Sequence, residues 1–456
     1  MKLSFHGAVR EVTGSCMHLK VKDTAGVEHR YLFDCGMFQG EHLCGDKNMR
    51  PFAFDPKHVE AVFVTHPHAD HNGRLPKLIK EGFAGPIYMT PPCTALSRLV
   101  LEDAHHIMAE EAEKCGSSVL YELADLLGTF DRVKTVGYHE EVAPAPGIKI
   151  YFHEAGHVLG SAYISVEAEG KRVIFSGDIG NDDVPILPQT EAISRADVVV
   201  CESTYGHRVH EPIAERETKL RGALEEVMTN KGVLLIPAFS IERTQELLYA
   251  LDRLLEHELK TTMPIFLDSP MAIKATQVYR DFKEYLRFDS PILQEADRDF
   301  FSFKNLRETL TVEESKAINN VPAPKVIIAG SGMMSGGRIM HHLIRYLPDP
   351  STRLLIIGYQ ATGTIGRKIY EGEKRVRIFG QSVEVKAKTA AIGAFSAHGD
   401  MNKLTRWLHP ESGKIPTEIF LTHGDSDAKE VFATHLRHEL GTQVVIPEFE
   451  SEHEIS

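Results

Sequence analysis

Three histidines and one aspartate lie within six residues of one another, in the run Thr65-His66-Pro67-His68-Ala69-Asp70-His71. An apolar segment, residues 59–64, precedes this run and has the composition of a strand. His66 and His68 are two positions apart, so their side chains point the same way on an extended chain. Imidazole and carboxylate donors at a strand end are typical of a site for a metal such as zinc. A histidine-rich solvated loop is the alternative, but spacing, residue types and strand context together disfavour it.

Further potential metal ligands follow other expected strands along the chain. One stretch, Gly156-His157-Val158-Leu159-Gly160, places a histidine between glycines that permit a tight turn. Another, Ile419-Phe420-Leu421-Thr422-His423, repeats the apolar strand and Thr-His ending that precede the first run. The polar residues at these strand ends are Asp34, His157, Asp178, Glu202, His398 and His423. A turn-capping residue is the alternative at Asp34 and Asp178.

The run from His66 to His71 resembles the H-x-H-x-D-H signature of the metallo-β-lactamase superfamily. The resemblance implies a site for two zinc ions that share Asp178. It assigns His66, His68 and His157 to one ion and Asp70, His71 and His423 to the other. It also gives Asp34 the role of orienting ligands by hydrogen bonds. The expected catalytic residues are Asp34, Asp70, Glu202 and His398.

Three later motifs resemble those of the β-CASP group of this superfamily: C-E-S-T-Y-G with Glu202, S-A-H-G-D with His398, and L-T-H-G-D with His423. The resemblance implies an α/β fold, namely a metallo-β-lactamase αββα four-layer sandwich with an inserted α/β β-CASP domain. Residues 1–206 and 372–456 are expected to form the metallo-β-lactamase domain, and residues 207–371 the insertion. No KH domain before the first strand and no extra domain after His423 are expected.

A histidine at the last motif is typical of the RNA-processing members of the group, whereas DNA-processing members usually lack it. The chain is therefore similar to the endonuclease subunit of the pre-mRNA 3′-end cleavage machinery and to its compact bacterial and archaeal relatives. The expected reaction is hydrolysis of RNA phosphodiester bonds by a hydroxide held between the two zinc ions. His398, steadied by Glu202, is expected to donate a proton to the leaving oxygen.

A glycine-rich turn follows the expected strand at residues 326–329 and precedes a helix. Backbone N–H groups at such a turn favour an anion, although a purely structural turn is the alternative. A second strand, polar turn and helix occur around residues 237–243. The residues expected to contact RNA phosphates are Ser240, Arg243, Ser331, Gly332, Ser335, Gly336 and Gly337.

Three other functions are compatible with parts of these motifs. A thioesterase or lactonase of the same fold would use similar ligands, but such chains are typically shorter and lack the insertion and the His398 motif. A DNA nuclease is the second alternative. A non-catalytic RNA-binding scaffold is the third, and the complete set of ligands disfavours it. The choice between endonuclease and 5′-exonuclease action is open at this point.

Composition agrees with an ordinary globular protein: of 456 residues, 42% are hydrophobic and 25% are charged. No apolar run approaches a membrane span, and the start is too polar for a signal peptide. The six cysteines form no C-x-x-C pair, which fits a reducing compartment such as the cytoplasm. The net charge of −13 argues against broad non-specific binding of nucleic acid. The expected partner is single-stranded RNA, with no membrane, and the oligomeric state is open, a homodimer included.

Overall fold

The computed structural model describes residues 1–455 except for 40–45, 116–117, 183, 213, 256–258, 260, 288–298, 300, 359, 361–362 and 394–395. The chain forms two compact units. The first comprises Met1–Asp182, Leu187–Val209 and His398–Ser456, and the second comprises Asp183–Ile186 and His210–Ala397.

The first unit contains two seven-stranded sheets. One has the order β22-β1-β2-β3-β4-β5-β6, with β22 (Glu452–Glu454), β1 (Lys2–Phe5), β2 (Met17–Lys22), β3 (Glu28–Phe33), β4 (Ala61–Phe63), β5 (Ile87–Met89) and β6 (Val133–Thr135). The other has the order β21-β20-β11-β10-β9-β8-β7, with β21 (Gln443–Val445), β20 (Glu418–Thr422), β11 (Val198–Glu202), β10 (Lys171–Phe175), β9 (Ala162–Ala168), β8 (Ile148–Glu154) and β7 (Val142–Ala145).

The two sheets pack face to face through one apolar core. Successive strand residues point to opposite faces, so Tyr31 and Phe33 of β3 enter this core while Leu32 faces away from it. Phe33 stacks on Phe175 of β10, with ring centroids 3.7 Å apart and planes 4° apart. This contact joins the two sheets at the ends of β3 and β10, just before Asp34 and Asp178 in the chain.

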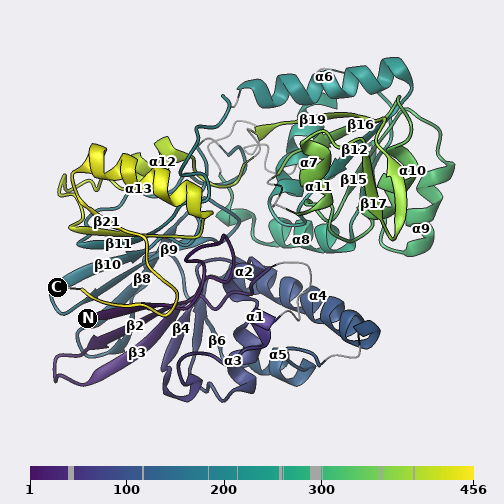
Figure 1. The fold of residues 1–456 in the computed structure, drawn as a ribbon. Coiled ribbons are helices and arrows are strands. Elements are labelled where there is room, and N and C mark those ends of the chain that lie inside the picture. The colour runs from purple at the N-terminus through teal and green to yellow at the C-terminus, as the bar shows by residue number, and fades with distance from the viewer. Residues whose placement is uncertain are drawn as a thin grey trace. The chain divides into compact units, whose positions relative to one another are not determined.

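Helices cover the outer face of each sheet. The helices α2 (Ala69–Asn72), α3 (Leu75–Lys80), α4 (Pro91–Cys115) and α5 (Leu123–Phe130) lie beside the first sheet, and α12 (Met401–Trp407) and α13 (Ser426–Leu440) lie beside the second (Figure 1). Leu75 and Leu78 pack with Leu32 on one side of the sandwich, and Phe432 packs with Ile419 on the other. The four layers confirm the expected αββα sandwich.

The second unit is built on a parallel six-stranded sheet of order β14-β13-β15-β12-β16-β19. Its strands are β14 (Leu306–Glu308), β13 (Ile265–Asp268), β15 (Lys325–Ala329), β12 (Val233–Pro237), β16 (Arg353–Ile356) and β19 (Lys388–Ala391). Its helices are α6 (Ala214–Asn230), α7 (Arg243–Leu254), α8 (Pro270–Asp281), α9 (Val312–Ala317), α10 (Ile339–Tyr346) and α11 (Ile365–Tyr370) (Figure 1). Leu235 packs with Leu343 of α10, while Leu234, on the opposite face, is also fully buried. Burial on both faces explains the continuous apolar strands.

The second unit extends beyond residue 371, where the sequence analysis placed its end. The strand β19 pairs in parallel with β16, with Ala391 opposite Ile356. A hairpin of β17 (Arg375–Ile378) and β18 (Gln381–Glu384) buries Ile378 and Val383 in the core of this unit. The chain therefore enters the first unit again only at His398.

Among the described residues, no helix combines the length and apolar character needed to cross a membrane.

Candidate metal centre and catalytic residues

The segment that carries the first histidines leaves the end of β4 and becomes the short helix α2. The turn after β3 lies against it, because Cys35 N donates a hydrogen bond to His71 O and Met37 N donates one to Ala69 O, both at 2.8 Å. A Cβ atom at Gly36 would lie 1.5 Å from the carbonyl oxygen of Asp70. The close approach therefore requires glycine there, and it sets the position of Asp70 and His71.

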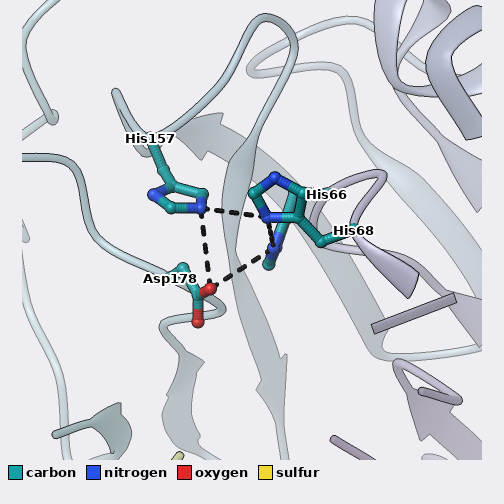
Figure 2. A group of neighbouring side chains, drawn as sticks. All are labelled: His66, His68, His157 and Asp178. Atoms are coloured by element: carbon teal, nitrogen blue, oxygen red, sulfur yellow. Dashed lines mark hydrogen bonds and ion pairs between the residues drawn. The ribbon is translucent and has the colours of Figure 1, made fainter. Parts of the chain in front are cut away.

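The first group of potential ligands consists of His66, His68, His157 and Asp178 (Figure 2). His68 Nδ1 lies 3.1 Å from His66 Nε2 and 3.3 Å from His157 Nε2. Asp178 Oδ2 lies 3.4 Å from His66 Nε2 and 3.6 Å from His157 Nε2. Tetrahedral zinc with bonds of about 2.05 Å separates its ligand atoms by roughly 3.3 Å, so these spacings fit one ion.

The second group consists of Asp70, His71 and His423. His423 Nε2 lies 3.1 Å from His71 Nε2 and 3.4 Å from Asp70 Oδ2. His423 follows β20 directly and has φ +49°, a left-handed conformation that is uncommon for a residue other than glycine. The backbone there is held because His423 N donates to Ala8 O at 2.7 Å.

The carboxylate of Asp178 faces both groups. Its Oδ2 faces the first group, whereas its Oδ1 lies 3.4 Å from His71 Nε2 and 3.3 Å from His423 Nδ1. Oδ1 is buried and has no hydrogen-bond partner among the described residues. Buried polar atoms are normally paired, so an orphaned carboxylate oxygen among imidazole nitrogens fits a cation. The donor set of five histidines and two carboxylates suits divalent metals that accept both nitrogen and oxygen.

Burial and neighbouring charges set the protonation of this cluster. Burial lowers the pKa of His68 to about 4 and holds the pKa of His66 and of His157 well below its ordinary value. Burial alone would raise the pKa of Asp178, but His423, His71 and other histidines reverse the effect and hold it low. Neutral imidazoles and ionised carboxylates are the forms that bind metals.

Asp34 lies at the end of β3 with φ +61° and is fully buried. Its Oδ2 accepts a hydrogen bond from His71 Nδ1 at 2.7 Å, and its Oδ1 accepts one from Thr65 N at 2.8 Å. Since a carboxylate only accepts, His71 Nδ1 carries a proton, and Nε2 faces the second group. Burial alone would lower the pKa of His71, but Asp178 and Asp34 raise it well above its ordinary value, so an ion that binds at Nε2 must displace a proton there. Thr65, whose Oγ1 also contacts Asp34 and lies 3.0 Å from His66 Nδ1, was missed in the sequence analysis.

His398 and Glu202 lie together beside the first group. His398 Nδ1 donates to the Glu202 carboxylate, with both oxygens 3.2 Å away, and lies 3.8 Å from Asp178 Oδ2. Glu202 is fully buried at the end of β11, and its Oε1 accepts from Ile179 N at 2.7 Å. Gly399 N in turn donates to Ile179 O at 2.7 Å, so the turns after β10 and around His398 are joined.

The residues expected to contact phosphate lie in the second unit, after β12 and β15. Ser331 Oγ accepts a hydrogen bond from Ser335 N at 3.1 Å, which folds the glycine-rich turn. Gly337 has φ +72°, and a Cβ atom there would lie 2.5 Å from Gly330 O. Gly332 is buried beside Phe239, whereas Gly336 has open space around it. Ser240 Oγ lies 3.4 Å from Ser269 Oγ.

Arg243 differs from its expected role as a phosphate contact. Its side chain is 5% exposed, and its Nη1 lies 2.6 Å from Glu246 Oε2 and 2.7 Å from Glu242 Oε2. A buried guanidinium already paired with two carboxylates offers little charge to an anion at the surface. Its structural role is therefore an ion pair at the start of α7.

Lys429 is a second residue that the sequence analysis missed. It is fully buried on α13, and its Nζ donates to Ala8 O at 3.1 Å and to Val9 O at 2.5 Å. Ala8 O is also the acceptor for the backbone of His423. Burial lowers the pKa of Lys429 to about 7. The sequence does not predict this contact, because Lys429 lies in a charged amphipathic helix and its acceptors are backbone atoms more than four hundred positions earlier in the chain.

Family models match three parts of this chain. Residues 24–238 match the metallo-beta-lactamase superfamily, residues 244–369 match the Beta-Casp domain, and residues 382–447 match the Zn-dependent metallo-hydrolase RNA specificity domain.

Relatives match over nearly the whole chain. Ribonuclease TTHA0252 of Thermus thermophilus is 38% identical over 433 residues, covering 94% of this chain and 94% of that protein. Cleavage and polyadenylation specificity factor 73 of Drosophila melanogaster is 29% identical over 92% of this chain and 59% of that protein. A solved structure of a protein of unknown function from Enterococcus faecalis V583 shares the fold, with a TM-score of 0.56 at 11% identity over 99% of each chain. The chain belongs to the metallo-β-lactamase superfamily and, within it, to the β-CASP group.

The contacts of Asp34 give a prediction about metal affinity. Asn tolerates the left-handed backbone at this position, so Asp34→Asn removes the charge with little backbone strain. We expect zinc affinity to fall by about 10- to 100-fold, the usual effect of losing a partner that orients a ligand. Competition with a chromophoric chelator measures this affinity. Asp55→Asn, at an exposed helix cap, is the control and should bind as the wild type does; equal affinity of all three proteins would contradict the role of Asp34.

Proposed function

We propose that this protein is a ribonuclease that hydrolyses phosphodiester bonds of single-stranded RNA with two zinc ions. The position of Asp178 carries the proposal, because its two carboxylate oxygens face two separate groups of ligands. We assign His66, His68 and His157 to one ion, and Asp70, His71 and His423 to the other. The ribonuclease and cleavage-factor names of the relatives support RNA as the substrate.

Bound together, the two ions would supply an activated water and offset the charge that develops on the phosphate. The protein orients and prepares these ligands: Asp34 accepts a hydrogen bond from His71 Nδ1 and so directs Nε2 towards the ion, and burial keeps His66, His68 and His157 neutral. Ligands that are oriented in advance need little reorganisation during the reaction, which favours the transition state.

His398 is the proposed proton donor to the leaving oxygen. Its Nδ1–H is held by Glu202, so the transferable proton is on Nε2. Glu202 stabilises the protonated imidazole and fixes its orientation. His398 is half-buried at 19% side-chain exposure, which leaves it accessible to a substrate.

RNA positioning is assigned to the turns after β12 and β15. Ligands of parallel α/β sheets bind beyond the carboxyl ends of the strands, where Ser240 and the glycine-rich turn lie. We therefore assign contacts with RNA phosphates to Ser240, Ser331, Gly332, Ser335, Gly336 and Gly337, without Arg243. Two divalent ions would also add four positive charges to a chain whose net charge is −13.

A cytoplasmic location is part of the proposal. Cys16, Cys35, Cys93 and Cys201 are buried free thiols, which supports a reducing compartment.

The proposed substrate is tested with single-stranded RNA labelled at either end, with and without a 5′ monophosphate. We expect cleavage that a chelator abolishes and zinc restores, and slower cleavage of DNA of the same sequence. Product lengths distinguish internal cuts from stepwise removal of nucleotides at the 5′ end. Cleavage of DNA as fast as RNA would contradict RNA specificity, and hydrolysis of a thioester or lactone without any cleavage of RNA would contradict the ribonuclease assignment.

The role of His398 predicts a selective loss of rate. His398→Ala should retain its metal and lose roughly 10²- to 10⁴-fold in single-turnover rate on RNA, the usual contribution of general acid catalysis. It should lose less on a nitrophenyl phosphodiester, whose leaving group needs no proton. Metal content and both rates are measured, with His409→Ala, an exposed histidine of the same unit, as the control. Loss of metal, or equal loss on both substrates, would contradict proton donation.

A further inference from the structure

A second cluster of potential metal ligands lies in the first unit, outside the seven residues of the centre described above. It consists of His139, His153 and Glu191. His139 lies in the turn between β6 and β7, His153 belongs to β8, and Glu191 belongs to the segment before β11. Three segments that are separate in the sequence thus bring two imidazoles and a carboxylate together.

The donor atoms have the spacing of ligands around one ion. His139 Nε2 lies 3.1 Å from Glu191 Oε1, and His153 Nδ1 lies 3.6 Å from Glu191 Oε2. One donor atom from each of the three residues can be chosen so that all lie within 4.8 Å of one another. Adjacent ligand atoms of tetrahedral zinc are roughly 3.3 Å apart, so the two His–Glu separations are near this value and the widest separation would shorten by at most about 1.5 Å.

The orientation of His153 is fixed as in known metal sites. Its Nε2 lies 2.9 Å from Ser165 Oγ, and its ring stacks on Tyr163 with centroids 4.6 Å apart. A metal-binding histidine usually donates a hydrogen bond from its second nitrogen. When an ion is bound, His153 Nε2–H would donate to Ser165 Oγ rather than accept from Arg172 Nη2, which lies 3.5 Å away, and Nδ1 would face Glu191. The ring therefore loses little freedom when it binds an ion.

The backbones of the other two residues are also held. Glu191 N donates to Glu154 O at 2.9 Å, and Trp407 Nε1 donates to Glu191 O at 3.0 Å. His139 N donates to Phe152 O at 2.9 Å. The side chains of His139 and Glu191 are 61% and 34% exposed, so one side of the cluster is open to entering ions and to water ligands.

We propose that His139, His153 and Glu191 form a separate binding site for one divalent transition-metal ion, of which zinc is the test case. Histidine nitrogens favour such ions over magnesium or calcium, which prefer oxygen ligands. A single carboxylate and two neutral imidazoles would leave a net positive charge, which water or hydroxide can share. Without an ion, the same residues make His–Glu contacts that are open to solvent on the side of His139 and contribute little to stability.

An ion at this site would also stabilise the loop that carries His157. Thr190 Oγ1, next to Glu191, donates to Ala155 O at 2.9 Å. A Cβ atom at Gly156 would lie 2.8 Å from Pro188 O, so the two segments are in close contact. Binding at Glu191 would therefore restrain the segment packed against residues 155–157, and zinc should raise the melting temperature of the wild type beyond its effect on a variant of this site.

Equilibrium dialysis against a series of buffered free-zinc concentrations tests the proposal. The proteins are the wild type, His139→Asn and Glu191→Gln, with zinc per chain measured by plasma mass spectrometry. Asn suits the left-handed φ of +63° at position 139, and Gln preserves the shape of Glu191. We expect each variant to saturate with one zinc ion fewer than the wild type. Because all proteins keep the other seven ligands, this difference does not depend on how many ions the proposed catalytic centre binds.

His438→Asn is the matched control, since His438 is an exposed histidine that contacts a single carboxylate, Glu439, at 3.0 Å. It should bind as much zinc as the wild type and show the same zinc-dependent rise in melting temperature. Equal saturation by the wild type, His139→Asn and Glu191→Gln would overturn the proposal, as would an equal loss in His438→Asn. Because two variants report on the same site, misfolding of one still leaves the other as a test.

Discussion

The carboxylate of Asp178 is the group on which the rest of the first unit depends. It is 2% exposed, and imidazole nitrogens face both of its oxygens. An isolated buried carboxylate would be costly, and it would tend to take up a proton. The surrounding histidines instead keep it ionised. Segments that follow β4, β8, β10 and β20 must therefore meet at one point, and the two facing sheets bring them there.

The ligands depend on a surrounding layer of hydrogen bonds. Asp34 and Thr65 hold the histidines that follow β4, while Glu202 holds His398. Lys429 holds the turn at Ala8 that accepts the backbone of His423. Each of these contacts joins parts of the chain that are distant in sequence. The centre is thus a product of the completed fold, and it cannot form in any one of its motifs alone.

The sequence predicted the parts of this structure that depend on local pattern. The motif from His66 to His71 is visible in the sequence itself. The four-layer sandwich and the gathering of Asp178 and His423 near that motif were expected from the resemblance to the metallo-β-lactamase superfamily. The end of the second unit was misplaced, since β19 is a short strand that pairs only with a distant partner. Arg243 was expected to contact phosphate because the burial of its guanidinium between Glu242 and Glu246 arises only in the completed fold. The contacts of Lys429 and the cluster of His139, His153 and Glu191 join residues that are far apart in the sequence, so no local pattern predicts them.

Anomalous scattering from crystals of the zinc-loaded protein, recorded above and below the zinc absorption edge, tests the shared role of Asp178 most directly. We expect two zinc peaks at this centre, one among His66, His68 and His157 and the other beside His71 and His423, with the Asp178 carboxylate between them. A single peak, no peak, or two peaks of which only one contacts Asp178 would contradict that role.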